Sequence, residues 1–360
     1  MVEWERPVGD RVEEALAYDA ATETLYVGTR SGFVLAVDGT SGENRWFHDA
    51  VGEVSSAPTF DDTRVYVGFR EPGGSVALDK AAGRLLWRTV AVGWVARDPV
   101  VRQNTVLFVS DNSLLALSPR TGERLAKYDL SIPRNVELSN LSPWGEGLVA
   151  SYLGDTDSGL VLVPRIRSTQ SESRSLGHEA AELYVTRDES IVVHGTARTG
   201  DGTILTVLEA PPESGGVRES TGADDASGIS ELFQAGTRLL GLAEGSVLMS
   251  TVPPAVSAFK PTSPAELERQ WRTRRYYAGL EAEAWSPSGL QAPGSVAVTG
   301  SGLEGVVGYA PVSGEILYHF ELEEGAVVRG IAAGPERLYL LISTATGGQA
   351  RLVALVTPGR

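Results

Sequence analysis

The chain of 360 residues contains no cysteine, only 3 Lys and 2 Met, and no long uninterrupted apolar run. The lack of cysteine excludes disulfides, thiolate nucleophiles and cysteine-ligated zinc or iron–sulfur sites. No stretch approaches the roughly 18 apolar residues that a membrane-spanning helix requires, so we expect no membrane span. The first residues also lack the basic and apolar regions of a signal peptide, so targeting is not readable from the start of the chain.

Positive charge is also scarce. The 31 Lys and Arg residues stand against 46 Asp and Glu, which gives a formal net charge of −15 at pH 7. An electrostatic grip on a phosphate backbone would need a local basic patch, and we therefore expect no nucleic-acid partner. A hydrophobic fraction of 42% and a charged fraction of 21% are typical of a soluble globular chain with a full core.

The histidines show neither metal-ligand spacing nor a neighbouring nucleophile. They are scattered along the sequence: His48, His178, His194 and His319. We expect no metal, no cofactor and no catalytic residue. The segment from Gly300 to Gly305 matches the dinucleotide-binding fingerprint, but residues 306–309 have a strand pattern where that fingerprint needs a helix. We predict a hairpin turn there.

An internal repeat runs through the chain. The segment from Leu25 to Trp46 recurs between Val65 and Trp87, and its Ala, Asp, Gly and Trp return with a shift of 41 residues. Weaker copies begin further along the chain, near Val106, Leu148, Ile191, Leu239, Ser295 and Leu338. Successive starts lie 40 to 56 residues apart, which is the length of four short antiparallel strands. Each unit therefore reads as one propeller blade.

The repeated residues have structural roles. Asp38 is suited to accept backbone hydrogen bonds in a tight turn, and Gly42 to take the positive φ of that turn. Trp46 is large and flat enough to fill the joint between two blades. The predicted structural repeat residues are Ala36, Asp38, Gly42, Trp46, Ala77, Asp79, Gly83, Trp87, Gly122 and Gly314, together with Trp4.

The two ends of the chain complete one another. Residues 338–356 supply the first strands of a unit, and residues 2–7 supply an orphan strand with Trp4. Joined, they approximate the motif, and such closure pairs edges that an open ring would expose. We predict a single all-β domain over residues 1–360, an eight-bladed propeller of four-stranded antiparallel blades whose N- and C-terminal strands share one blade. Seven blades are the alternative.

One segment departs from the repeat. A rim insertion is predicted around residues 253–285, where Ser263, Pro264 and Glu266 resemble a helix start. The segment carries a basic aromatic cluster of the residue types that are enriched in binding hot spots. These candidate partner contacts are Arg269, Trp271, Arg272, Arg274, Arg275, Tyr276 and Tyr277. In the alternative interpretation, Trp271 is the docking tryptophan of its own blade and the arginines pair with nearby glutamates.

The motif resembles a known one. The pattern Ala-x-Asp-x-x-Thr-Gly-x-x-x-Trp is the tryptophan-docking repeat of the pyrroloquinoline-quinone-like propellers. The segments 36–46 and 77–87 match it, with Ser41 and Ala82 in the Thr place. The family divides into quinoprotein dehydrogenases and non-catalytic scaffolds such as the outer-membrane assembly lipoprotein BamB. The dehydrogenase branch implies an adjacent cysteine pair, which this chain lacks.

The resemblance therefore favours a non-catalytic scaffold for protein–protein interaction, most similar to BamB. It implies a periplasmic or cell-envelope location, a protein partner such as an outer-membrane assembly complex, and a chain that is monomeric by itself. A cytoplasmic location stays open. The alternative function is an extracytoplasmic sensor or small-ligand-binding propeller, and a quinone-dependent dehydrogenase is less favoured.

Overall fold

The protein was examined as a computed structural model. It describes residues 2–13, 16–50, 52–54, 56–70, 73–90, 98–102, 104–110, 113–129, 136–145, 147–154, 158–163, 172–175, 179–185, 191–196, 203–208, 230–233, 238–243, 246–251, 255–263, 266–273, 286–292, 295–301, 305–344 and 348–356. Within these ranges the regular elements are β-strands. The described ranges contain no helix with the length and apolarity needed to cross a membrane.

The described strands form eight four-stranded antiparallel sheets, numbered here in chain order. Sheet 1 holds β2 (Leu16–Asp19), β3 (Thr24–Gly28), β4 (Phe33–Asp38) and β5 (Asn44–Asp49). Sheet 2 holds β6 (Thr59–Phe60), β7 (Arg64–Phe69), β8 (Gly74–Asp79) and β9 (Leu85–Val90). Sheet 3 holds β10 (Val100–Arg102), β11 (Thr105–Ser110), β12 (Ser113–Leu117) and β13 (Arg124–Asp129). Sheet 4 holds β14 (Val136–Trp144), β15 (Gly147–Gly154), β16 (Ser158–Val163) and β17 (Glu172–Ser175).

The second half of the chain continues the same plan. Sheet 5 holds β18 (Glu179–Val185), β19 (Ile191–Thr196), β20 (Thr203–Leu208) and β21 (Ser230–Phe233). Sheet 6 holds β22 (Arg238–Ala243), β23 (Ser246–Thr251), β24 (Ala255–Ser263) and β25 (Glu266–Arg272). Sheet 7 holds β26 (Ser286–Ala292), β27 (Ser295–Ser301), β28 (Gly305–Tyr309) and β29 (Ile316–Glu321). Sheet 8 combines β30 (Ala326–Ala333), β31 (Arg337–Thr344) and β32 (Arg351–Val356) with β1 (Val2–Pro7).

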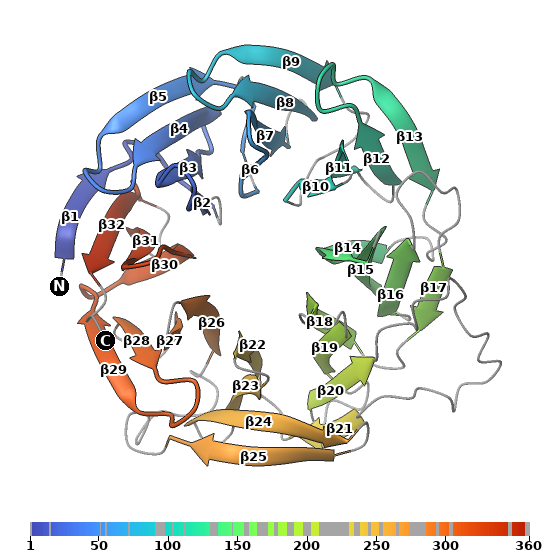
Figure 1. Ribbon diagram of the computed structural model, residues 1–360, viewed down its shortest axis with the longest axis vertical. Helices are drawn as coiled ribbons and strands as arrows, with labels where there is room; N and C mark the ends of the chain where they lie inside the picture. The colour runs from blue at the N-terminus through green and yellow to red at the C-terminus, as the bar shows by residue number, and fades with distance from the viewer. Residues whose placement is uncertain are drawn as a thin grey trace.

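The sheets stand side by side around a ring, as Figure 1 shows. The first strand of each sheet lies nearest the centre and the fourth lies at the circumference. Apolar side chains fill the space between neighbouring sheets: Val34 of sheet 1, for example, belongs to the same buried cluster as Val65 and Val67 of sheet 2. This is the β-propeller architecture that the repeat predicts, and the fold class is confirmed.

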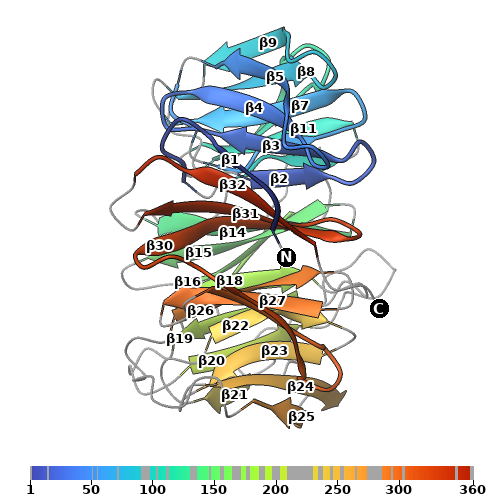
Figure 2. The same cartoon turned by 90° about the vertical axis from the view of Figure 1, so that its left-hand side faces the viewer.

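Sheet 8 closes the ring with both ends of the chain. β1 pairs antiparallel with β32, and Trp4 lies opposite Ala354, as Trp46 lies opposite Ala36 in sheet 1. Figure 2 shows β1 alongside β32. The predicted sharing of one blade by the N- and C-terminal strands is confirmed, and it removes an edge that an open ring would expose.

Two ion pairs reinforce this closure. Arg337 donates from Nε and Nη2 to the two carboxylate oxygens of Glu3, and Arg351 donates from Nη1 to Glu5 at 2.8 Å. The bidentate pairing with Arg337 lowers the pKa of Glu3 below its ordinary value, against a smaller opposing effect of burial. Both pairs are partly exposed, so each contributes modestly.

We predict that Glu3→Gln lowers the free energy of unfolding by about 1 kcal/mol at pH 7. Because the pKa of Glu3 is lowered in the folded state, this stabilisation is present above the unfolded-state pKa and is lost as the pH falls through the folded-state pKa. Urea unfolding at pH 7 and near pH 3 would measure the difference, which should shrink at the lower pH. Glu323→Gln is the control, since Glu323 is 79% exposed and lies 3.5 Å from Arg351. An equal effect of the two changes would contradict the prediction.

The structure corrects two expectations about the second half of the chain. Leu239 lies in β22, the first strand of sheet 6, whereas the other repeat starts fall on second strands. The long unit is therefore the one before β23, and not the one after Leu239. The helix expected after Ser263 is also wrong, because Glu266–Arg272 forms β25 and pairs with β24. The sheet pairing of this segment outweighs its local helix-start signal. Residues 274–285 lie outside the described ranges, and the rim insertion stays a prediction there.

The fingerprint-like glycine segment joins two strands. β27 ends at Ser301 and β28 begins at Gly305, and the two strands pair antiparallel, with Val296 opposite Tyr309. The predicted hairpin is confirmed. Because a strand follows the glycines, no helix N-terminus is available there for a pyrophosphate.

Candidate functional site

Each described docking tryptophan lies at a joint between two neighbouring sheets. Trp46, on the outermost strand of sheet 1, donates from its indole Nε1 to the backbone oxygen of Lys80 in sheet 2 at 2.9 Å. Its side chain is buried. Its ring centroid lies 5.9 Å from that of Tyr26. One side chain thus fills the joint and satisfies its own donor, as a buried indole requires.

The same donation recurs at three other joints. Trp4 donates to the Gly39 oxygen at 3.0 Å, Trp87 to the Pro119 oxygen at 2.8 Å and Trp271 to the Pro311 oxygen at 2.8 Å. In every case the acceptor belongs to the next sheet of the ring. The ring is therefore held by repeated side-chain contacts between rigid sheets.

A glycine lies against each of these four indoles. The four are Gly42, Gly83, Gly122 and Gly314, with φ between 67° and 75°. A Cβ at Gly83 would lie 2.6 Å from the Trp46 ring, closer than carbon atoms approach. Glycine is thus required here both for the backbone conformation and for the space.

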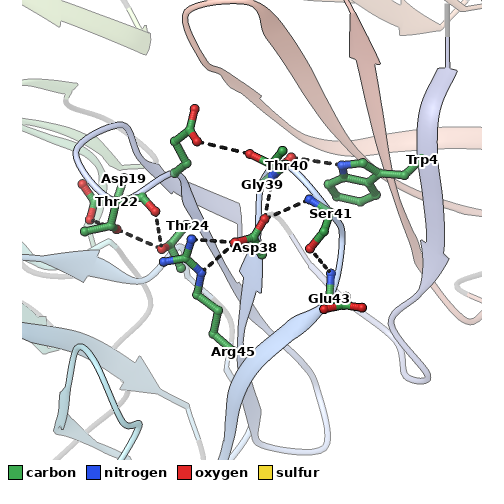
Figure 3. A network of polar contacts seen from close by, with 11 residues as sticks. Trp4, Asp19, Thr22, Thr24, Asp38, Gly39, Thr40, Ser41, Glu43 and Arg45 are labelled. Carbon is green, nitrogen blue, oxygen red and sulfur yellow. Dashed lines mark hydrogen bonds and ion pairs between the residues drawn. The ribbon is translucent and has the colours of Figure 1, made fainter.

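The turn before each joint is fixed locally. The Asp38 carboxylate accepts hydrogen bonds from the backbone N–H groups of Thr40 at 2.9 Å and Ser41 at 2.8 Å, and pairs with Arg45 at 2.7 Å. Figure 3 shows this network beside the Trp4 indole. Burial by itself would raise the pKa of Asp38, but these hydrogen bonds outweigh it and hold the pKa below its ordinary value. The carboxylate is therefore a turn anchor.

A buried ion pair also joins sheets 1 and 2. The Lys80 ammonium lies 2.7 Å from the Asp19 carboxylate, with side-chain exposures of 11% and 5%. Lys80 also donates to the Asp61 backbone oxygen at 3.0 Å and lies over the Phe60 ring. Burial would raise the pKa of Asp19, but hydrogen bonds, first that from Lys80, lower it. Sequence reasoning missed this pair, although a lysine in a chain with 3 Lys was a signal.

The outer strands carry a second regular feature. Six of them contain a β-bulge one residue before the docking position. The bulged residues are Glu3, Arg45, Leu86, Leu125, Gln270 and Leu317. A bulge increases the local twist and interrupts pairing along an edge. These strands end their sheets, so their outer edges have no strand partner among the described residues.

Apolar side chains are exposed on several outer strands. They are Phe47 on β5, Leu85, Leu86 and Val90 on β9, Leu125 on β13, and Ile316 and Leu317 on β29. In Figure 1, β5, β9 and β13 follow one another along the circumference. β9 carries three of these residues, and Val90 is 75% exposed. The outer strands therefore offer apolar contacts that the fold itself does not cover.

The predicted contact cluster divides in the structure. Arg269 is exposed on β25 and Arg272 is half-buried. Trp271 occupies a joint, with its ring against Gly314, which is the alternative that the sequence allowed. Arg274, Arg275, Tyr276 and Tyr277 lie outside the described residues. The structure thus brings together three of the seven residues on one strand and gives Trp271 a structural place.

Comparison with protein families identifies the repeat. A family model described as outer membrane protein assembly factor BamB matches residues 2–71 and 67–331. The chain belongs to this family. A comparison with curated proteins found no match.

Solved structures show the same fold for this BamB-family chain. The crystal structure of BamB from Moraxella catarrhalis matches with a TM-score of 0.66 at 14% identity, covering 100% of this chain and 98% of that one. A β-propeller domain of Cps50 (Swd1) from Myceliophteria thermophila matches at 0.60 and 10% identity, over 99% of both chains. Quinohemoprotein alcohol dehydrogenase from Comamonas testosteroni matches at 0.60 and 13% identity, over 100% of this chain and 77% of that one.

The last of these similarities raises the question of a quinone and its calcium ion. Among the residues that the structure describes, no three His, Cys, Asp or Glu side chains are grouped as a metal would require. The best-placed carboxylates, those of Asp19 and Asp38, are committed to Lys80 and to a turn. The described residues do not fit a quinone–calcium site, and no chemical step is derived through one.

Proposed function

We propose that this BamB-family chain is a non-catalytic scaffold for protein–protein interaction that assists the assembly of outer-membrane β-barrel proteins. The family match across residues 2–331 carries the proposal. The location proposed with it is the periplasmic side of the cell envelope, and the partner is an outer-membrane assembly complex.

The geometry supports a scaffold. Indole hydrogen bonds and the buried Lys80–Asp19 pair fix neighbouring sheets to one another, so the ring presents its surface without rearrangement. The strongest charges at the joints serve structure, as shown for Asp19 and Asp38. What remains on the outside are strand edges and exposed apolar side chains, which suit a partner and not a small substrate.

Affinity purification from the native cell tests this function. The tagged full-length protein should recover an outer-membrane barrel that carries soluble periplasmic repeats, in mild detergent. Its gene deletion should lower the amounts of folded outer-membrane barrels. If neither occurs, the assembly role is wrong.

A titration with pyrroloquinoline quinone and calcium separates the scaffold from the dehydrogenases that share the fold. We expect no new absorbance band and no alcohol-dependent dye reduction. A band with turnover would overturn the non-catalytic assignment.

A further inference from the structure

The outer strand β9 differs from its counterparts at positions that the register makes equivalent. Three residues after the docking position, β5 has Asp49, β13 has Asp129 and β29 has Glu321, each at the end of the pairing. At the same place β9 has Val90, opposite Gly74. A charged residue on an edge strand discourages pairing with another chain. β9 lacks this protection.

The remaining outward positions of β9 are also favourable for a partner. Leu85 and Leu86 are 50% and 44% exposed, whereas the equivalent residues of β5 are Asn44 and Arg45. Arg88 lies between these leucines and Val90, and its guanidinium rests over the Phe69 ring, 5.1 Å from the centroid. The edge therefore alternates apolar side chains with a positioned positive charge.

The local charge indicates what kind of partner fits. Residues 80–97 contain Lys80, Arg84, Arg88 and Arg97 and no Asp or Glu, in a chain of net charge −15. Arg84 precedes β9 with its side chain 78% exposed. An acidic segment would meet opposite charge here and repulsion over much of the remaining surface. A second copy of this chain would instead bring the arginines of two β9 edges together, which is unfavourable.

We propose that the outer edge of β9 binds an extended acidic segment of a partner protein as a fifth strand of sheet 2, an inference that rests on the scaffold role proposed above. The backbone of β9 supplies the ladder hydrogen bonds of strand addition. Leu86 and Val90 contact apolar residues of the segment, and Arg84 and Arg88 pair with its carboxylates.

The probe is a synthetic peptide in which valine and glutamate alternate, with a valine–lysine peptide of equal length beside it. Hydrogen exchange of the full-length protein should show protection of amides in residues 85–90 with the glutamate peptide and none with the lysine peptide. Absence of protection at peptide concentrations up to about 1 mM overturns the proposal. Equal protection by both peptides overturns its acidic selectivity.

Val90→Asp restores the acidic residue that the other outer strands carry, at an exposed position where folding should be retained. It should weaken glutamate-peptide binding by about tenfold. The matched control is Phe47→Asp on β5, which makes the same change at a 70% exposed side chain and should leave binding unchanged. An equal loss in both variants, or self-association through β9, contradicts the proposal.

Failure of this inference and failure of the assembly role give different results. If the peptide does not protect β9 but the outer-membrane barrel still co-purifies, the scaffold function stands and the β9 edge is not its contact. If β9 is protected but no barrel is recovered, the edge binds acidic strands and the assembly role is wrong.

Discussion

Lys80→Met should lower the free energy of unfolding by about 3–5 kcal/mol at pH 7, because it leaves the Asp19 carboxylate buried without its cation. Methionine keeps the length and apolar contacts of the lysine side chain, so the loss reports on charge. Denaturant unfolding followed by tryptophan fluorescence would measure it. Since Lys80 joins two sheets, the variant should also open the joint at which its backbone oxygen accepts the Trp46 indole hydrogen bond.

The pH dependence separates this effect from a packing defect. In the wild type the pKa of Asp19 is lowered, so its stabilisation is present above the unfolded-state pKa and is lost as the pH falls through the folded-state pKa. The variant lacks the main hydrogen bond that lowers this pKa. The stability gap between the two proteins should therefore shrink near pH 3.

Two further variants control the Lys80 experiment. Arg84→Met removes a cation from the same turn, but Arg84 is 78% exposed and lies 3.9 Å from Asp79, so its loss should change stability by less than about 0.5 kcal/mol. Asp19→Asn placed on the Lys80→Met background should recover part of the loss, because it removes the unpaired charge. If Arg84→Met and Lys80→Met were equally destabilising, the buried pair would not hold the joint.

Residues that act locally could be read from the sequence. The turn residues Asp38 and Gly42 have short-range roles, and Trp46 recurs at a fixed offset, so the repeat predicts the blade and its joint together. Closure by Trp4 could be predicted for the same reason, since an orphan strand with the motif tryptophan must complete a blade.

Features that depend on pairing between distant strands could not. The helix-start signal at Ser263 is local, and the ladder between β24 and β25 overrides it. Val90 is distinctive only once the register aligns it with Asp49 and Glu321. The Lys80–Asp19 pair joins residues of two sheets, which no spacing within one repeat displays.

Gly83→Ala should be among the most damaging single changes of an uncharged residue. Its φ of 67° costs an alanine about 1 kcal/mol, and the added Cβ would lie 2.6 Å from the ring of Trp46. Because the indole is held by its hydrogen bond to Lys80, relief requires the two sheets to move apart. Overpacking of this kind costs about 1–3 kcal/mol more, so we expect a total of about 2–4 kcal/mol.

Gly9→Ala isolates the backbone contribution. Gly9 has a φ of 85° and nothing within 4 Å of a Cβ, so its substitution should cost only the conformational part, about 1 kcal/mol. Melting temperatures and denaturant midpoints of the two variants give the steric cost at the joint by difference. If Trp46→Phe, which shrinks the ring, relieved most of the Gly83→Ala loss, contact between this glycine and the indole would be established as its cause. Equal losses in Gly9→Ala and Gly83→Ala would mean that the joint yields without resistance, and the docking contact would not be what makes the ring rigid.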